Sequence, residues 1–509
     1  MKKIYSLFLL TLFTGCLAST AIAQTVRQSD VDAFDKYAEA ARQQWNVPGM
    51  SIAIVKDGKV VLSKGYGVRE LGKSDAVNAE TLFGAMSTTK AMTAVAMGML
   101  VDEGKVSWDD KVIKHLPGFR VADPYVTNEL KIRDLFTHNA GLGNADFLWA
   151  WTPELSSDEI AWRMQYAPQA YSFRGGYTYQ NIMYLVAGKV IERVSRMSWE
   201  KFMIERIFGP LGMRSSFPTL AMSRYENRSK AHFEIEKKVE VIPEMSVDSA
   251  AAAGAVWSTS DDIAKWMIFN LGATTVNGKE LLKPATLAEI LKPQAIIPTG
   301  QFYPTTRLTK PHWTTYGLGW FQQDYRGEMV NMHTGSLSGR TAIVGLIPDK
   351  KFGIYIFGNI DHAEVRHALM FKAFDMFVFG DNSRDWSTEA KALYDGLSAE
   401  AEKPLAAVKS MRVQTTKPTL PLEAYAGRYY DPFFGTMDVT LANGKLDLKV
   451  GKVVSGALDH WQNDTFQVVW SKRWWGVDFI AFQLHPLTNK VSSVTISGAT
   501  LRRVETKGN

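Results

Sequence analysis

The sequence predicts an α+β protein, in which a sheet flanked by helices is followed by a small all-β barrel. From about Val31 to Phe379, strand-like and helix-like segments alternate without a long linker. Thr388 to Met411 is charged and rich in alanine, which predicts a helix. From Tyr425 onward only short alternating strands with turn signals remain, and seven or eight of them predict the barrel.

Composition narrows the class of protein before any motif is considered. The 509 residues are 46% hydrophobic, 22% charged and 12% aromatic, which excludes a disordered chain, collagen and a multi-span membrane protein. The formal net charge is +6, but Lys and Arg alternate with Asp and Glu along most of the chain, so no nucleic-acid partner is expected. The length predicts two or three domains.

Residues 1–23 have the three regions of a secretory signal peptide. Two lysines precede an apolar run from Ile4 to Phe13, and Ala21-Ile22-Ala23 offers a cleavage site. That run is too short to span a bilayer, and no later stretch predicts a transmembrane segment. We therefore expect export to the periplasm or the medium.

The only cysteine, Cys16, lies within this leader, where Phe13-Thr14-Gly15-Cys16 weakly resembles a lipobox. Cleavage after Ala23 is favoured over a lipid anchor at Cys16. The mature chain would then have no cysteine, which excludes disulfides, thiol catalysis and Cys-ligated metals.

The first region has identifiable elements in order. A hairpin is predicted from its alternating apolar residues and its Asp57-Gly58 turn, and it is followed by helices and strands whose apolar runs imply burial. The expected segments are strands Gly49–Val55 and Lys59–Ser63, helices Met92–Val101 and Ile182–Val194, strands Thr341–Pro348 and Phe352–Asn359, and a helix Ala363–Phe379.

The C-terminal region begins after linker-like residues at 414–418. Asn443-Gly444, between two alternating segments, is a strong hairpin signal. The expected domains are therefore residues 27–385, a helix and linker over 386–418, and a barrel over 419–509. A barrel core with a docking face is favoured over a ligand cavity as the explanation of its dense aromatics, which are Trp461, Phe466, Trp470, Trp474, Trp475, Phe479 and Phe482.

Ser87-Thr-Thr-Lys90 stands immediately before a strongly apolar helical stretch. A serine and a lysine one helical turn apart share a face, and burial would lower the lysine pKa so that the amine can take the hydroxyl proton. The spacing alone is ambiguous, because Ser198-Trp-Glu-Lys201 has it too and is interpreted as an ordinary helix cap. Ser87 by itself could be another cap.

Two later segments supply partners. Tyr179 and Asn181 lie at a loop-to-helix junction, where a nearby lysine ammonium would let the phenol ionise more easily and shuttle protons. His333-Thr334-Gly335-Ser336 precedes a predicted strand, and Gly335 permits close approach of a ligand. Taken singly, Tyr179 fits a core aromatic and His333 a surface histidine.

Taken in order, these segments resemble the serine β-lactamase and penicillin-binding-protein superfamily, in its class C-like branch. Its motifs S-x-x-K, Y-x-N and H-x-G match Ser87 to Lys90, Tyr179 to Asn181 and His333 to Gly335. Stretches at 132–142, 254–262 and 316–320 are also similar, and the resemblance covers about Val31 to Phe379. It implies a β-lactamase/transpeptidase-like fold with an antiparallel sheet. The region after Pro418 resembles, less securely, a lipocalin-like barrel.

The resemblance also implies roles. Ser87 would form an acyl-enzyme, with Lys90 and Tyr179 as the proton-transfer pair, and Tyr179 would serve as base when water releases the acid. Asn181 would orient the substrate amide or the lysine. The backbone N–H groups of Ser87 and Ser336 would hold the oxyanion, and His333, Thr334 and Gly335 would line the opposite wall. No cofactor and no metal are expected.

One departure bears on the substrate. Many β-lactamases of this branch have lysine where His333 stands, so an esterase or peptidase acting on a small molecule or peptide is favoured over a β-lactamase. D-amino-acid and peptidoglycan-type peptides are included among the candidate substrates. A slow-turnover penicillin-binding sensor is the rival from another class, and oligomeric state is left open.

Other hydrolase and oxidoreductase classes lack their signatures. The chain has no G-x-S-x-G elbow, no H-E-x-x-H pair and no G-x-G-x-x-G fingerprint in a strand-to-helix context. Substrate specificity is expected from loops at 143–153 and 293–311. Their aromatics suggest an apolar cleft, and they are Phe147, Trp149, Trp151, Phe302 and Tyr303.

Overall fold

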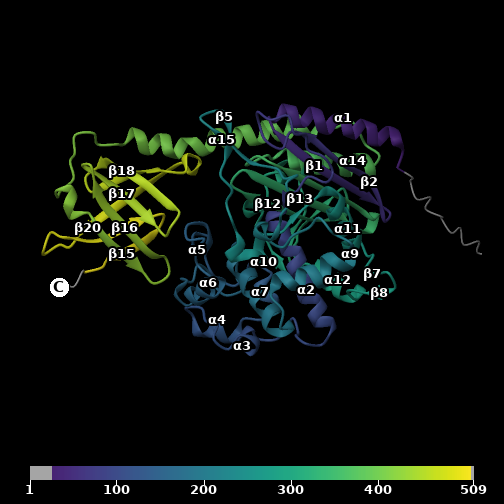
Figure 1. The fold of residues 1–509 in the computed structure, drawn as a ribbon, viewed down its shortest axis with the longest axis horizontal. Coiled ribbons are helices and arrows are strands. Elements are labelled where there is room, and N and C mark those ends of the chain that lie inside the picture. The colour runs from purple at the N-terminus through teal and green to yellow at the C-terminus, as the bar shows by residue number, and fades with distance from the viewer. Residues whose placement is uncertain (1–25, 506–509) are drawn as a thin grey trace, which may run out of the picture.

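A computed structural model describes residues 26–505 and contains a large α+β region and a barrel (Figure 1). The central sheet has eight strands in the order β2-β1-β14-β13-β12-β11-β10-β9, and every neighbouring pair is antiparallel. The predicted antiparallel sheet is confirmed. Its strands are β1 (Gly49–Lys56), β2 (Lys59–Gly67), β9 (Ala295–Ile296), β10 (Thr314–Tyr316), β11 (Phe321–Tyr325), β12 (Glu328–Leu337), β13 (Arg340–Ile347) and β14 (Phe352–Gly358).

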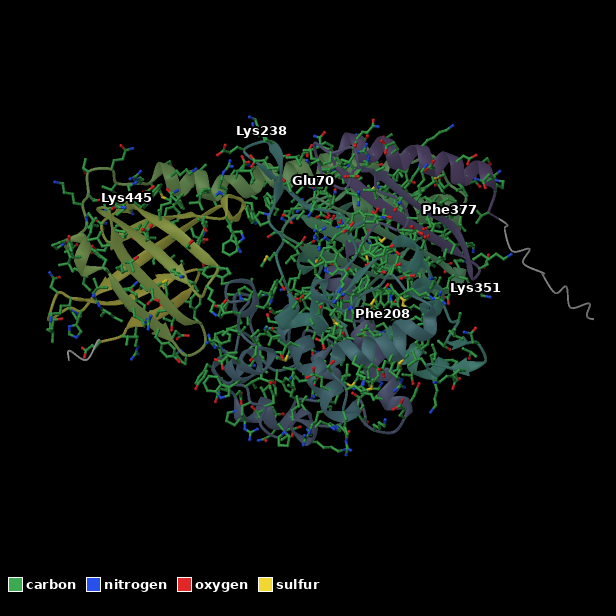
Figure 2. All side chains as sticks on the ribbon, viewed as in Figure 1. Glu70, Phe208, Lys238, Lys351, Phe377 and Lys445 are labelled. Atoms are coloured by element: carbon green, nitrogen blue, oxygen red, sulfur yellow. The ribbon has the colours of Figure 1, made fainter. Side chains whose placement is uncertain are left out.

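Helices cover both faces of this sheet, which explains why β1, β13 and β14 are apolar on both faces. Ile52 and Ile54 join the core beneath α1 (Gln28–Gln44) and α14 (Val365–Val378), whereas Ala53 and Val55 join the opposite core. Figure 2 labels Phe377, which packs against the first core, and Phe208, which belongs to the second.

The second core contains the helices that carry the candidate site. Helix α11 (Ser260–Asn270) packs on β1 and β14, while α2 (Thr89–Asp102), α7 (Asn181–Ser195) and α10 (Ala251–Gly254) pack on one another. Helix α2 is buried from Thr89 to Leu100 because almost every residue in it is apolar or small. The helices predicted at 92–101 and 182–194 correspond to α2 and α7.

The C-terminal region is a closed eight-stranded antiparallel barrel over residues 427–503. Its first and last strands pair at Tyr429 and Tyr430, which closes the sheet, and its interior is filled by side chains such as Phe466 and Phe482. The strands are β15 (Gly427–Asp431), β16 (Gly435–Ala442), β17 (Lys445–Val450), β18 (Val454–Gln462), β19 (Thr465–Trp470), β20 (Val477–Leu484), β21 (Val491–Ile496) and β22 (Ala499–Arg503). Lys445 marks the start of β17 in Figure 2.

A long helix and an aromatic contact connect the barrel to the larger region. Helix α15 (Trp386–Ser410) packs on α14 and leads to the barrel (Figure 1). Below it, the short helix α5 (Phe147–Ala150) faces the barrel, and the Phe147 ring lies 5.1 Å from the ring of Phe434. The Trp151 ring lies 5.4 Å from that of Trp470. The predicted docking face on the barrel is therefore present.

The predicted signal peptide at 1–23, with Cys16, lies outside the described residues. Within residues 26–505, none of the helices combines the length and apolar character required to cross a membrane.

Candidate active site

Ser87 lies in a short 3-10 helix, Met86–Thr88, at the N-terminal end of α2. Met86, immediately before it, has a φ of 50°, which is rare for a side chain of this size. The surrounding structure holds this backbone in place, since the Ala85 N–H donates to the carbonyl of Val256 at 2.7 Å. Ser87 therefore projects from a constrained turn rather than from a regular helix.

Lys90 lies one turn further and is completely buried. Its Nζ lies 3.1 Å from the Ser87 Oγ, 2.6 Å from the Asn181 Oδ1 and 2.9 Å from the carbonyl oxygen of Ala253. Burial lowers the pKa of Lys90 to about 7, although the charge of Asp146 acts in the opposite direction. The predicted depression of the lysine pKa is confirmed.

Tyr179 and Asn181 enter the site from the start of α7. Asn181 accepts from Lys90 through Oδ1, and its Nδ2 donates to both carboxylate oxygens of Asp146 at 2.9 Å. Lys90 Nζ lies 4.8 Å from the centre of the Tyr179 ring. The Y-x-N segment therefore contacts the S-x-x-K segment directly.

The expectation that Tyr179 ionises more easily is wrong. Desolvation raises the pKa of its hydroxyl well above the usual range, and a hydrogen bond with Ser87 offsets only part of this rise. The lysine that was expected to favour the phenolate is itself only partly charged near pH 7, because burial lowers its pKa to about 7. Tyr179 therefore keeps its proton at neutral pH.

His333 belongs to β12 itself, rather than to a loop that precedes a strand. Its Nδ1 is 2.6 Å from the Thr334 carbonyl oxygen, which can only accept, so Nδ1 carries the proton. Nε2 then accepts from the Tyr316 hydroxyl at 2.8 Å. Burial, reinforced by the Lys90 charge, lowers the pKa of His333 to about 3, so this wall of the site is neutral. The side chain is buried and not at the surface.

Gly335 brings β12 against the nucleophile turn. A Cβ at this position would lie 2.5 Å from the Ala85 carbonyl oxygen and 3.0 Å from the Ser87 nitrogen, so only glycine fits. The close approach puts Ser336 beside Ser87 at one pocket. Arg366 Nη1 donates to the Gly335 carbonyl at 2.5 Å and to the Ser336 Oγ at 2.9 Å, which anchors the strand.

Thr334 is held from the other side, because its Oγ1 lies 2.6 Å from the Tyr303 hydroxyl. Tyr303 was expected to line an apolar cleft with Phe302, but Phe302 is buried in the core beside the sheet. Tyr303 therefore supports β12, Phe302 packs on Phe321 of β11, and neither lines the pocket described below.

A small pocket opens at Ser87. Its described lining contains no charged side chain and consists of Met86, Ser87, Trp149, Asn181, Val247, Ala250, Ala253, Gly254, Ser336 and Leu337. Of the loop aromatics expected to form a cleft, Trp149 lines it, whereas Phe147 and Trp151 pack on the barrel. The pocket is therefore narrow, largely apolar and polar mainly at Ser87, Asn181 and Ser336.

The second S-x-x-K copy is the helix cap that its sequence indicated. The Ser198 hydroxyl accepts from the Lys201 backbone N–H at 3.1 Å, and the Lys201 side chain is exposed beside Glu205. This segment provides a natural control for the site at Ser87.

Sequence reasoning missed three side chains of the site. Asp146 was only one residue of a predicted specificity loop, Tyr316 was part of a similar stretch, and Arg366 was within a predicted helix. The available signal for Asp146 was a single charged residue in an otherwise uncharged loop. For Tyr316 and Arg366 no local signal exists, because their contacts with β12 come from β10 and from helix α14, which are distant in the sequence.

Comparisons with known proteins agree with this geometry. The beta-lactamase family matches residues 34–373, and a domain of unknown function, DUF3471, matches residues 411–507. The chain is 28% identical to the unguisins hydrolase ungD of Aspergillus violaceofuscus, over 81% of this chain and 77% of that protein. It is 24% identical to the protein flp of Staphylococcus aureus, over 64% of this chain and 62% of the other.

A solved structure has the same fold. The octameric penicillin-binding protein homologue from Pyrococcus abyssi aligns with a TM-score of 0.61 at 21% identity, covering 93% of this chain and 99% of that one. The family match spans well over half of this sequence and contains the three motifs that meet at Ser87. This chain therefore belongs to the beta-lactamase family of serine hydrolases and penicillin-binding proteins.

Proposed function

We propose that this protein is an exported serine hydrolase that cleaves ester or amide substrates through an acyl-enzyme on Ser87. One observation carries the proposal: the environment of Lys90 suits a general base. A neutral amine has two hydrogens and one lone pair. Its hydrogens are directed to the Asn181 Oδ1 and the Ala253 carbonyl, which leaves the lone pair for the Ser87 hydroxyl 3.1 Å away.

The chemistry follows from these contacts. Lys90 takes the Ser87 proton as Oγ attacks the substrate carbonyl carbon, and the backbone N–H groups of Ser87 and Ser336 stabilise the oxyanion. The proton then passes to the leaving alcohol or amine, with the Tyr179 hydroxyl as relay. In the second half-reaction water attacks the acyl carbon, and a proton of that water passes by way of Lys90 to the Ser87 Oγ as the acyl C–O bond breaks and the acid leaves.

The substrate class follows from the charge of the pocket. Since His333 is neutral and the pocket-lining residues carry no fixed cation in the described chain, the site offers little attraction for a substrate carboxylate. This supports an esterase or peptidase over a β-lactamase. The name of the Aspergillus relative, a hydrolase of unguisins, supports hydrolysis in general.

The test is a rapid-mixing burst measurement with p-nitrophenyl acetate. We expect a burst of about one p-nitrophenolate per wild-type protein, no burst in Ser87→Ala, and a wild-type burst in Ser198→Ala, which alters the second S-x-x-K copy. An undiminished burst in Ser87→Ala would refute the proposal. A burst without turnover, on esters, peptides and a chromogenic cephalosporin alike, would favour the slow-turnover sensor.

A further inference from the structure

The Asp146 carboxylate belongs to none of the three motifs, yet it lies one residue away from Lys90 in the hydrogen-bond network. Its two oxygens accept from Asn181 at 2.9 Å, from the Trp149 Nε1 at 3.0 Å and from the Asn144 Nδ2 at 3.0 Å. All of these donors are neutral. Among these contacts, therefore, the carboxylate has no cationic partner, and no ion pair neutralises its negative charge beside the site.

We propose that Asp146 is a positioning residue for Lys90, acting through Asn181, and that the C-terminal barrel holds it in place. This inference rests on the proposed function, because it assigns a role in activating Ser87.

The orientation of the Asn181 amide carries the first step. An amide can present either its oxygen or its nitrogen to Lys90, and only the oxygen can accept a lysine hydrogen. A carboxylate accepts and does not donate, so Asp146 requires the Asn181 Nδ2 on its side and the Oδ1 toward Lys90. This directs one hydrogen of the lysine away from Ser87.

The charges around Lys90 carry the second step. Within residues 26–505, the titratable side chains that face Lys90 come from several parts of the chain. They are His138 and Asp146 from loops, Tyr179 and Tyr184 from the start of α7, and His333 from β12. Burial lowers the pKa of both histidines and raises the pKa of both tyrosines, so all four are neutral near pH 7. Asp146 supplies the negative charge that favours the lysine ammonium.

The barrel contacts carry the third step. Asp146 immediately precedes α5, a helix too short to be stable by itself. Phe147 stacks on Phe434, the Trp151 ring lies 6.1 Å from that of Trp475, and Glu154 accepts from the Lys452 N–H at 2.8 Å. Three points along eight residues are thus held by the barrel, and the loop that carries Asp146 is fixed with them.

The experiment measures the pH dependence of Ser87 acylation by p-nitrophenyl acetate. Because Lys90 must be neutral to act as base, wild-type kcat/KM should rise with pH through about 7. In Asp146→Asn the acidic limb should move down by roughly one pH unit, since the charge that favours the ammonium is gone. The plateau should fall roughly tenfold or more, because Asn181 loses its orientation.

Two variants make this result interpretable. Asp146→Glu keeps the charge and should retain the limb near the wild-type pH, while Asp158→Asn, an exposed carboxylate paired with Lys189, should change neither limb nor plateau. An unchanged profile in Asp146→Asn would overturn the inference while leaving the acyl-enzyme intact. Absence of a Ser87-dependent burst in the wild type would instead overturn the proposed function.

The barrel is tested with a matched pair of aromatic variants. Phe434→Ala removes the stacking on Phe147, and it should lower the plateau and shift the limb in the same direction as Asp146→Asn. Phe479→Ala truncates a barrel aromatic that packs on Trp461 and should leave both unchanged. A wild-type profile in Phe434→Ala, on a substrate too small to reach the barrel, would remove the barrel from the inference.

Discussion

At the scale of single residues, Lys90 illustrates the conflict between function and stability. Its ammonium would lose all of its hydration in the folded protein, and burial therefore lowers its pKa to about 7. Below that pH the folded protein must hold a buried ammonium. The destabilising contribution of Lys90 to the free energy of unfolding is therefore largest there. Between pH 7 and the ordinary lysine pKa, the unfolded chain binds the extra proton, so this contribution fades as pH rises.

Replacement of this lysine should therefore have a pH-dependent effect on stability. We expect Lys90→Met to raise the free energy of unfolding, relative to wild type, by roughly 3 kcal/mol more at pH 6 than at pH 9.5. Chemical denaturation at the two pH values measures this difference. Lys201→Met, at the exposed lysine of the second S-x-x-K copy, is the control. It should change the free energy of unfolding by the same amount at the two pH values. A pH-independent effect of Lys90→Met would contradict the lowered pKa.

At the scale of elements, the site depends on how closely β12 crosses the turn before α2. Neither element can form the oxyanion site by itself. One candidate N–H donor, Ser87, belongs to the turn before α2, and the other, Ser336, belongs to β12. The crossing is set by Gly335 on one side and by the backbone of Ala85 to Ser87 on the other. Arg366 of α14 stabilises this part of β12 by donating hydrogen bonds to Gly335 and Ser336.

A methyl group at this crossing should separate the two donors. In Gly335→Ala the new Cβ meets backbone atoms that cannot rotate away, so we expect kcat for p-nitrophenyl acetate to fall roughly 100-fold or more. Steady-state kinetics and a thermal unfolding curve on the same preparation test this. Gly118→Ala, where no atom lies within 4 Å of the added Cβ, should keep wild-type kcat. Wild-type activity in Gly335→Ala would show that the crossing tolerates more space than its contacts imply.

At the scale of the whole molecule, aromatic contacts and ion pairs both attach the barrel, beside the hydrogen bond from Lys452 to Glu154. Aromatic rings of α5 and Trp151 pack on Phe433, Phe434, Trp470 and Trp475. Arg473 forms exposed ion pairs with Glu236 and Glu240 of the hairpin β4 (Ala231–Ile235) to β5 (Lys238–Ile242). Burial of aromatic surface should dominate, because exposed ion pairs contribute about 0–1 kcal/mol.

The two contacts can be separated by mutation. Trp151→Ala should destabilise the protein by about 2 kcal/mol and speed proteolysis of the linker at residues 411–418, since the barrel is released from α5. Arg473→Ala should change both quantities little, even at low salt. Thermal unfolding and limited proteolysis measure the two effects. A larger loss in Arg473→Ala than in Trp151→Ala would mean that charge, not aromatic packing, attaches the barrel.

Much of this architecture could be predicted from local sequence signals. The hairpin of β1 and β2, helices α2 and α7, and the barrel strands around Asn443-Gly444 each follow from periodicity and turn residues within a short window. The three motifs could be found because each depends on a few neighbouring residues. The division at residues 385 and 418 stays a prediction.

The remainder depends on contacts between distant segments. Phe147 and Phe434 meet although nearly three hundred residues separate them, and no pattern near either residue announces the pairing. The raised pKa of Tyr179 likewise follows from burial among His138, Phe321 and His333, which arrive from different elements. Local sequence shows the phenol and the lysine, but not the loss of water around them.

The attachment of α5 to the barrel also limits how this protein can diversify. In a hydrolase without such a barrel, the loop that contains Asp146 and Trp149 would be free to accumulate insertions and substitutions that alter the pocket. Here the same loop must satisfy two partners at once, the Asn181 amide and the barrel aromatics. Evolutionary change in substrate preference should therefore concentrate on Val247, Ala250 and Leu337, which line the pocket and make none of the aromatic contacts with the barrel described above.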